Sequence, residues 1–300
     1  MSKYLSVRGD VAEAIRENRP VIALESTIIA HGLPRPQNVE IALQAEEQAR
    51  KLGVVPATVG ILDGKVVVGL APGQIELLGT AEPVLKVSRK DFAYALATGR
   101  LGATTVCSTM MAAHLAGIRV FATGGIGGVH RGAEQSLDIS ADLLELSRTP
   151  VIVVSAGAKA ILDLPKTLEF LETRGVPVLG YGTSVFPAFY SAESELALDL
   201  TVERPEQIAE IYRAQRSLDL EQGLLVANPI PMEHEIPREI MKGYLRTALS
   251  EMGRADVTGK QVTPFLLSRV LELSGGKSLE SNIELLVNNV RLACEISRAL

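Results

Sequence analysis

The sequence predicts an α/β fold with three layers, α/β/α, in which helices cover both faces of a central, mostly parallel mixed sheet. Two observations support this prediction. Short β-rich runs alternate with helical stretches between residues 21 and 181, the pattern of βαβ units and parallel sheets. After about Glu203 the runs are mainly helical, which predicts extra C-terminal helices. Since no repeat or linker interrupts the chain, we expect one domain over residues 1–300.

The predicted strands are short runs rich in β-branched and aliphatic residues. A turn at Asp63–Gly64 joins two of them as a hairpin, because this residue pair favours tight turns. In chain order the strands are Val21–Leu24, Thr58–Leu62, Lys65–Gly69, Val84–Val87, Ala103–Val106, Arg119–Ala122, Val151–Val154, Val178–Tyr181 and Gly223–Ala227.

The predicted helices are longer runs with helical periodicity and recognisable start signals. Ser88 and Ser140 are expected N-caps, and Pro205, Pro237 and Pro264 suit a first helical position. In chain order the helices are Pro36–Leu52, Arg89–Thr98, Thr109–Ala116, Ala141–Ser147, Pro205–Ser217, Pro237–Met252, Pro264–Leu273 and Leu279–Leu300.

Composition excludes several classes of protein. The formal net charge of -5 and the absence of a basic stripe argue against nucleic-acid binding. No apolar run approaches the roughly 20 residues that span a bilayer, and the first residues lack the apolar core of a signal peptide. Cys107 and Cys294 match no metal-binding spacing. We therefore expect a cytoplasmic protein with reduced thiols and no membrane partner.

Thr123–Lys159 is the most informative stretch for function, because it ends in a lysine just beyond the apolar run Val151–Val154. Small residues around Lys159 leave room for a ligand. Open α/β sheets place their sites at the carboxyl ends of strands, and a lysine kept dry there can act as a nucleophile. The alternative is an ordinary solvent-exposed cation.

Glu25 also follows a predicted strand, where a carboxylate is well placed for acid–base chemistry. Its alternative role is a helix cap or an arginine partner. His130 lies among acidic residues that include Asp138 and Asp142. Carboxylates four residues apart suit a hard cation such as Mg²⁺ or Mn²⁺, although Asp142 can equally serve the positive end of a helix.

Several residues suit an anion such as phosphate. Lys86 ends a predicted strand, and hydroxyl groups including Thr105 lie where a strand meets a helix. The glycines of residues 124–128 can expose backbone N–H groups, but they do not form a dinucleotide-binding fingerprint.

Three asparagines lie in an otherwise apolar predicted helix: Asn282, Asn288 and Asn289. A buried asparagine amide offers both a donor and an acceptor, which suits a cyclic imide such as uracil. The alternative is an asparagine that faces solvent or another helix.

Long blocks of sequence carry a family resemblance over nearly the whole chain. They are ALESTIIAHGLPRPQN, TGGIGGVHRGAE, SLDISADL, VSAGAKAILDLPKTLEFLET, GYGT followed by FPAFY, and GGKSLESNIELLVNN. In these blocks the chain resembles the pseudouridine-5′-phosphate glycosidases, also called the indigoidine synthase A-like family. Cys107 and Ser108 are the least familiar residues of the pattern.

The resemblance implies reversible cleavage of pseudouridine 5′-phosphate to uracil and ribose 5-phosphate, in pseudouridine catabolism. It implies a homotrimer of three-layer subunits that uses a divalent metal, usually Mn²⁺. It implies that Lys159 forms an imine with the opened sugar, that Glu25 donates a proton and that Asp138 binds the metal. The expected substrate-binding residues are Lys86, Thr105, Val106, Ser140, Ala141 and Asp142, with Lys86 and Thr105 at the phosphate. His130 and Asn282 are expected to face the base.

Two other functions fit the same residues. An imine-forming aldolase acting on another sugar phosphate would use Lys159 and the phosphate contacts without a pocket for uracil. A non-catalytic sugar-phosphate-binding protein would bind without forming product, and it would leave Lys159 and Glu25 without a role.

Overall fold

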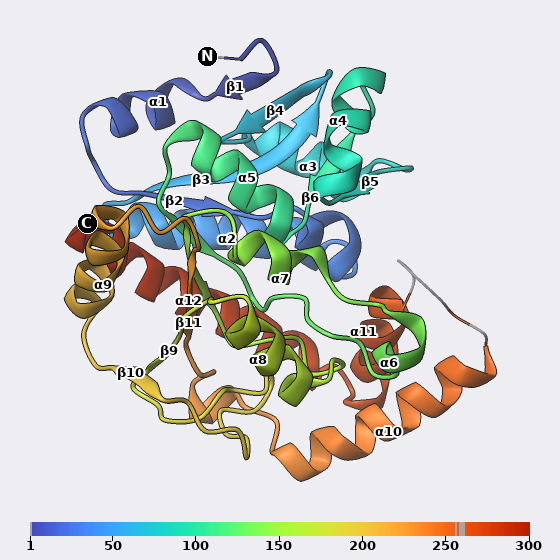
Figure 1. The fold of residues 1–300 in the computed structure, drawn as a ribbon. Coiled ribbons are helices and arrows are strands. Elements are labelled where there is room, and N and C mark those ends of the chain that lie inside the picture. Colours follow the sequence, from blue (N-terminus) through green and yellow to red (C-terminus); the bar gives the residue numbers. More distant parts are fainter. Residues whose placement is uncertain (1, 256, 258–261) are drawn as a thin grey trace.

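The computed structural model describes residues 2–255, 257 and 262–300. Within these residues the central sheet has eleven strands, and its main path runs β1-β4-β3-β2-β7-β8-β11-β9-β10, with β6 pairing with β3 and β5. Neighbouring strands are parallel except where β3 pairs with β4 and β6. The predicted mostly parallel mixed sheet is therefore confirmed (Figure 1).

The strands are β1 (Leu5–Val7), β2 (Val21–Leu24), β3 (Val55–Leu62), β4 (Lys65–Val68), β5 (Leu85–Val87), β6 (Gly102–Thr104), β7 (Val120–Ala122), β8 (Ile152–Ser155), β9 (Val178–Tyr181), β10 (Leu200–Val202) and β11 (Leu224–Ala227).

The α-helices are α1 (Gly9–Arg16), α2 (Gln37–Lys51), α3 (Pro72–Thr80), α4 (Arg89–Thr98), α5 (Val106–Ala116), α6 (Ala133–Ser136), α7 (Ala141–Leu146), α8 (Leu164–Thr173), α9 (Pro205–Ser217), α10 (Arg238–Arg254), α11 (Val262–Leu273) and α12 (Lys277–Ala299). A π-helical turn, η1 (Ile28–Gly32), follows β2, and a 3₁₀ turn, η2 (Met232–His234), follows β11.

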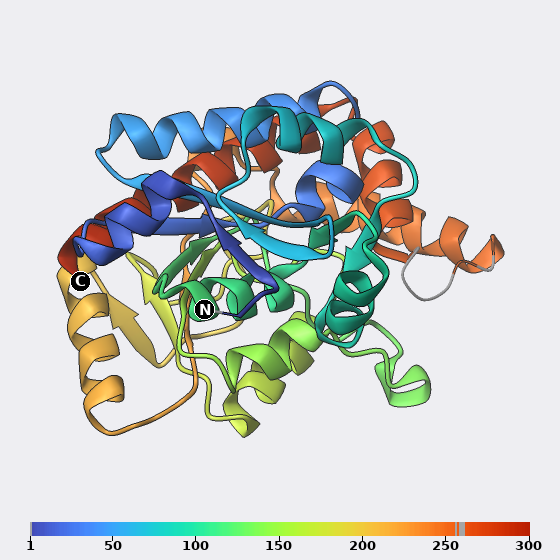
Figure 2. The same ribbon diagram turned by 90° about the horizontal axis from the view of Figure 1, so that it is seen from above.

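Helices cover both faces of the sheet, as the sequence predicts. Figure 2 shows α2 and α12 on one side of the strands and α5, α7 and α8 on the other. Every residue of β2, β7, β8 and β11 is buried. Burial on both faces explains why these strands read as continuous aliphatic runs and not as alternating patterns.

The predicted start and stop signals are largely confirmed. Asp63 and Gly64 take positive φ angles of 50° and 71° and join the antiparallel strands β3 and β4. Ser88 and Ser140 are the N-caps of α4 and α7. Pro205 is the first residue of α9. Pro237 lies one residue before α10, and Pro264 is the third described residue of α11.

Several predicted boundaries differ from the structure, and the difference that matters most lies at the site. Ala103–Val106 was predicted as a strand, but β6 ends at Thr104 and α5 already begins at Val106. Thr105 is the N-cap between them. Its neighbours Thr104 and Val106 are β-branched, and that residue type favours strands unless a helix start intervenes.

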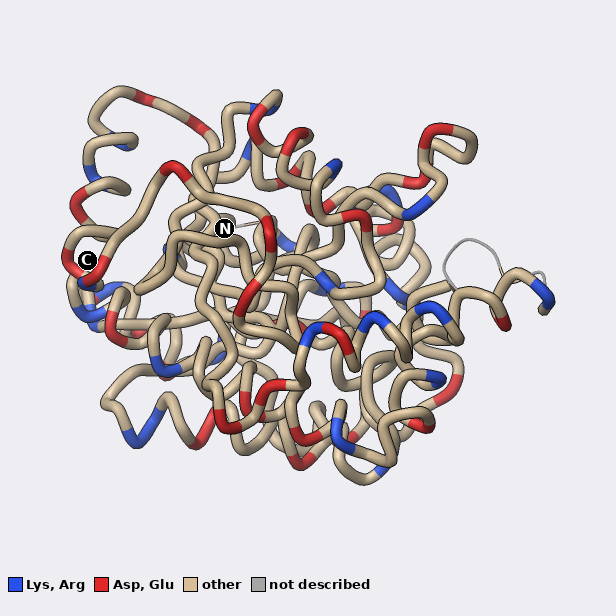
Figure 3. The backbone as a smooth tube through the Cα atoms, turned by 90° about the horizontal axis from the view of Figure 1, so that it is seen from below, with Lys and Arg blue, Asp and Glu red and all other residues tan. Residues whose placement is uncertain are grey.

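Charged positions are mixed along the chain: Figure 3 shows acidic and basic positions alternating over the elements drawn. Within the described residues, no helix has the length and apolarity needed to cross a membrane.

Candidate active site

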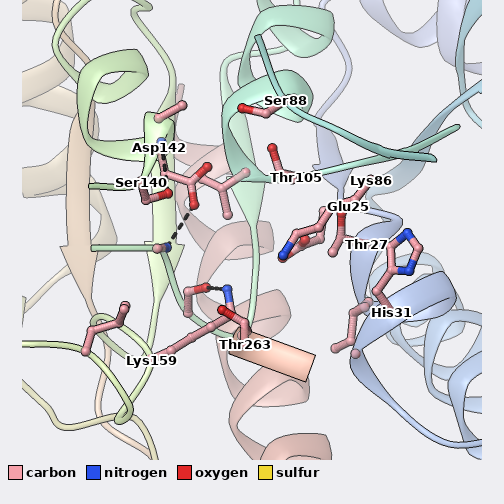
Figure 4. Close-up of a pocket in the computed structure, with 18 of the residues that line it drawn as sticks. Glu25, Thr27, His31, Lys86, Ser88, Thr105, Ser140, Asp142, Lys159 and Thr263 are labelled. Carbon is pink, nitrogen blue, oxygen red and sulfur yellow. Dashed lines mark hydrogen bonds between the residues drawn. The ribbon is translucent and has the colours of Figure 1, made fainter. Parts of the chain in front are cut away.

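A cavity of about 630 Å³ opens at the carboxyl ends of β2, β5, β6, β7 and β8. The site residues implied by the family resemblance all line this cavity: Glu25, Lys86, Thr105, Val106, His130, Asp138, Ser140, Ala141, Asp142, Lys159 and Asn282. Figure 4 shows Lys86 and Lys159 entering it from opposite sides, with Glu25 close to Lys86. The fold therefore gathers into one site residues that lie up to 257 positions apart.

Lys159 is held inside the cavity and does not extend into bulk water. It follows β8 through Gly157, which has φ +80° and would bring an added Cβ within 2.3 Å of the Pro187 carbonyl oxygen. The Lys159 side chain is partly buried, and its Nζ donates a hydrogen bond of 2.7 Å to the carbonyl oxygen of Gly125. A freely solvated cation therefore does not describe this lysine.

Glu25 follows β2 directly and accepts a hydrogen bond from the Thr123 hydroxyl on its Oε1 atom. Burial raises the pKa of Glu25, while the positive charge of Lys159 and the Thr123 hydrogen bond oppose that rise. The net result is a carboxyl that keeps its proton to a higher pH than usual. Among the described residues no arginine pairs with Glu25, so the structure does not support the arginine-partner alternative.

Two helices begin at the cavity. Ser88, Arg89 and Lys90 at the start of α4 and Thr105 and Val106 at the start of α5 all line it. Unpaired N–H groups and the positive end of the helix dipole favour an anion at such places. Together with Lys86 in β5, these helix starts make this wall, which we call the anion-binding wall, suited to a phosphate group.

Asp142 connects the start of α5, which forms part of this wall, to the glycine-rich run of residues 124–128. Its Oδ1 accepts a hydrogen bond of 2.9 Å from the Cys107 N–H, and its Oδ2 accepts one of 2.8 Å from the Gly127 N–H. The carboxylate thus serves the start of α5, whereas its backbone N–H is capped by the hydroxyl of Ser140 at the start of α7. Both oxygens already have backbone partners, so Asp142 is poorly suited to hold a metal ion.

The glycine-rich run allows close packing. A Cβ at Gly125 would lie 2.5 Å from the Phe189 ring, and one at Gly127 would lie 2.2 Å from Ser140 Oγ. Because the Gly127 N–H binds Asp142, it does not face the cavity as part of a phosphate cradle. This run therefore shapes the site without offering that amide to an anion.

Asp138 and His130 lie at the edge of the cavity, with Nδ1 and Oδ2 3.9 Å apart. Burial lowers the pKa of His130, and the Asp138 carboxylate opposes that shift. No group of three His, Cys, Asp or Glu side chains that could hold a metal gathers anywhere in the described residues. Mg²⁺ and related ions often use one or two carboxylates and keep several waters. Asp138, with 43% of its side chain exposed, fits such a hydrated ion but forms no closed cage.

The three asparagines of α12 have different surroundings. Asn282 is 7% exposed and lines the cavity, and its Oδ1 atom has no hydrogen-bond partner in the described structure. Asn289 donates to the Thr123 carbonyl oxygen at 2.8 Å and accepts from Asn228 at 2.9 Å. Asn288 donates to the Pro229 carbonyl oxygen at 3.0 Å. Only Asn282 is therefore available to a ligand.

Sequence reasoning missed part of the lining. Two basic residues after the strand at residues 85–87 were a usable signal for the anion wall, but Arg89 and Lys90 were assigned only to a helix. Thr27 and Ile28 follow Glu25 closely but carry no signal of their own. Other missed residues come from segments distant in sequence and include Phe189, Thr263, Pro264 and Leu267.

Residues 10–299 match the family model described as indigoidine synthase A like protein. The chain belongs to the indigoidine synthase A-like family. A relative in Mesorhizobium japonicum, named pseudouridine-5′-phosphate glycosidase, is 54% identical over 297 residues, which cover 99% of this chain and 97% of the relative. A relative of the same name in Staphylococcus aureus is 49% identical over 300 residues, covering 100% and 98% of the two chains.

Two solved structures have a similar fold. The prealnumycin C-glycosynthase AlnA, crystallised in complex with ribulose 5-phosphate, has a TM-score of 0.92 and 39% identity, with 100% of this chain and 98% of that chain covered. An indigoidine synthase A-like protein from Thermotoga maritima has a TM-score of 0.89 and 37% identity, with 98% and 95% covered.

Proposed function

We propose that this enzyme reversibly cleaves the carbon–carbon glycosidic bond of pseudouridine 5′-phosphate to give uracil and ribose 5-phosphate, as a step in pseudouridine catabolism. Relatives with 49–54% identity over nearly the full chain carry the name of this activity. The observation that carries the proposal is the placement of the Lys159 amine, the Glu25 carboxyl and an anion-binding wall in one cavity.

The chemistry explains why a lysine suits this site. Most glycosidases expel an oxygen or nitrogen leaving group with the help of two carboxylates. Here the leaving atom is carbon 5 of uracil, and direct loss of that carbon to an oxocarbenium ion is slow. An amine on carbon 1 of the opened sugar provides an easier route, because its nitrogen lone pair can form a C=N bond as the carbon–carbon bond breaks.

In the proposed reaction the Lys159 amine bonds to sugar carbon 1 while the bond from carbon 1 to the ring oxygen breaks. The nitrogen then gives up a proton and the released oxygen takes one, which leaves a neutral secondary amine on carbon 1. The bond to uracil then breaks, its electrons remain with uracil carbon 5, and carbon 5 takes a proton. The resulting imine is hydrolysed by water, which restores the amine and releases ribose 5-phosphate. The Lys159 Nζ is positioned for this role by the Gly125 carbonyl oxygen.

Glu25 is our candidate for the group that moves these protons. Its raised pKa keeps a larger protonated fraction near neutral pH than an ordinary carboxyl has. A general acid is most effective when its pKa lies near the working pH. The hydrogen bond from Thr123 fixes the orientation of the carboxyl.

The remaining residues position the substrate. We assign the phosphate to Lys86 and Thr105 at the anion-binding wall, and further substrate contacts to Val106 and the segment from Ser140 to Asp142, which also line the cavity. We assign the uracil ring to Asn282 and His130. The unpartnered Oδ1 of Asn282 can accept a hydrogen bond from an imide N–H, which would satisfy a buried polar atom.

We also propose a divalent metal, Mn²⁺, and a homotrimer. Asp138 would hold the metal with waters completing its shell, and the ion would organise water and the acidic loop beside the cavity. No chemical step above depends on it. Asp138→Ala should then abolish the response of activity to a chelator.

One assay tests the proposed activity. The enzyme is incubated with uracil, ribose 5-phosphate and Mn²⁺, and the product is analysed by mass spectrometry after acid treatment. We expect an acid-resistant C-nucleotide. Consumption of ribose 5-phosphate without uracil would instead support an aldolase. Saturable binding without any product would support a sugar-phosphate-binding protein.

A further inference from the structure

Arg89 belongs to the anion-binding wall, but its side chain has been given no individual role above. It is the first residue of α4 and lines the cavity beside Ser88 and Lys90. Its side chain is 47% exposed and pairs with Glu145, which is 1% exposed. Arg89 Nε donates to Glu145 Oε2 and Arg89 Nη2 donates to Oε1, both at 2.7 Å.

Glu145 is itself held firmly in place. Besides the two bonds from Arg89, Oε1 accepts from the Thr149 hydroxyl and Oε2 accepts from the Cys107 thiol at 3.4 Å. Burial raises the pKa of the Cys107 thiol, which therefore keeps the proton it donates. A carboxylate fixed by four contacts fixes the plane of the guanidinium that binds it.

This pairing uses only one edge of the guanidinium. Arginine carries five N–H donors in a rigid plane, and Glu145 accepts from Nε and Nη2. Nη1 has no hydrogen-bond acceptor anywhere in the described part of the chain. The guanidinium therefore keeps donors available at a wall where Lys86, Lys90 and two helix starts already favour an anion.

We propose that Arg89, oriented by Glu145, binds the 5-phosphate of the sugar and gives the enzyme its preference for a phosphorylated over a free pentose. The proposal rests on the proposed function for its substrate. Arg89 would contact the phosphate, and Glu145 would be a positioning residue that acts through Arg89. The competing explanation is that the pair only ties α4 to α7.

Steady-state kinetics with uracil and either ribose 5-phosphate or ribose separate these explanations. We expect Arg89→Gln to lower kcat/KM for ribose 5-phosphate at least about tenfold, mainly through KM, because a charge-assisted bond to phosphate is lost. The loss of kcat/KM with free ribose should be much smaller than the loss with ribose 5-phosphate. Glu145→Gln should act in the same direction but less strongly, and Arg89→Lys should recover part of the loss.

Arg50→Gln is a matched control. Arg50 pairs at 2.6 Å with the fully buried Glu46, which also accepts from Thr58, but Arg50 lies outside the cavity. This variant loses a similar ion pair, and its KM for ribose 5-phosphate should equal that of the wild type.

Calorimetric titration with inorganic phosphate makes the test independent of turnover. We expect wild type and Arg50→Gln to bind phosphate alike and Arg89→Gln to bind it at least about tenfold more weakly. Unchanged phosphate affinity and KM in Arg89→Gln would overturn the proposal, as would equal losses with ribose and ribose 5-phosphate. If the wild type forms no C-nucleotide, the proposed function fails, whereas weaker phosphate binding by Arg89→Gln would still support the phosphate contact.

Discussion

At the scale of single residues, Glu25 is the group that we expect to set the pH dependence of activity. Its pKa is raised by burial and held down by Lys159 and Thr123, so each neighbour can be tested separately. The hydroxyl of Thr123 donates to the carboxylate and therefore stabilises its charged form.

Changing these two residues should move activity in predictable directions. Glu25→Gln cannot transfer a proton, and we expect kcat to fall by about 10²–10⁴-fold.

Thr123→Val removes a hydrogen bond that favours the carboxylate form of Glu25. The pKa of Glu25 should therefore rise further, and the loss of activity at alkaline pH should begin at a higher pH. The measurement is the pH profile of kcat/KM, and an alkaline limb that moves to lower pH in Thr123→Val would contradict this assignment.

The same carboxyl makes a prediction for stability. Because its pKa is raised on folding, the folded protein binds more protons than the unfolded chain, and this group destabilises the fold as pH rises through the folded pKa. Glu25→Gln removes that cost. Thermal unfolding should therefore show a higher Tm than wild type at pH 8, with a difference that shrinks toward pH 4. A difference that grows on acidification would show the opposite sign of pKa shift.

At the scale of elements, the site depends on the junction of α5, α7 and the glycine-rich run. Asp142 joins the Cys107 N–H of α5 to the Gly127 N–H, and Ser140 Oγ lies where a Gly127 side chain would be. The same contacts therefore shape the wall of the site and hold these elements together.

Gly127→Ala tests this junction. The added methyl would lie 2.2 Å from Ser140 Oγ and 2.7 Å from Asp142 Oδ2, so it must displace both. Overpacking of this kind costs about 1–3 kcal/mol. We expect a lower Tm and a higher KM for ribose 5-phosphate. Gly73→Ala is the control, since its Cβ would meet nothing within 4 Å, and similar losses in both variants would contradict the role given to Gly127.

The sequence predicted these elements better than it predicted their junctions. Ser88 and Ser140 were recognised as caps because their side chains and the following pattern give a local signal. The boundary at Thr105 was missed because β-branched residues surround it. The partners of Asp142 were not predictable, since they lie 35 and 15 residues away in the chain.

At the scale of the whole molecule, α12 ties the end of the chain to the strands that build the site. Asn289 is fully buried and bonds both to the Thr123 carbonyl oxygen and to Asn228. Thr123 in turn donates to Glu25. The C-terminal helix thus supports Glu25, the proposed proton-transfer group, through one intervening residue.

Asn289→Ala should destabilise the protein. It leaves the Thr123 carbonyl and the Asn228 amide without partners, and each unsatisfied buried group costs about 1–3 kcal/mol. We expect a Tm several degrees below wild type. Asn288→Ala, which removes one bond from a partly buried residue, should cost less. Equal Tm values for wild type and Asn289→Ala would contradict the role of this contact.

The fold class could be predicted from the sequence because strands that are buried on both faces are continuous aliphatic runs. Such runs can be recognised locally, without knowledge of their partners. The three-residue strands β1 and β10, at the two ends of the sheet path, were missed together with α1, α3, α6 and α8. Such short edge strands contain too few residues for a periodic signal. For the site, the sequence named Lys159 and Glu25, but the missing hydrogen-bond partner of Asn282 and the pairing of Arg89 with Glu145 depend on packing.

The central claim is that Lys159 forms a covalent imine with the opened pentose, and reductive trapping tests it most directly. The enzyme is treated with ribose 5-phosphate and borohydride, digested, and mapped by mass spectrometry, with Lys159→Arg as the control. We predict one reduced sugar-phosphate adduct, on Lys159, that is absent from the control. An adduct on Lys86, or full turnover by Lys159→Arg, would contradict the account.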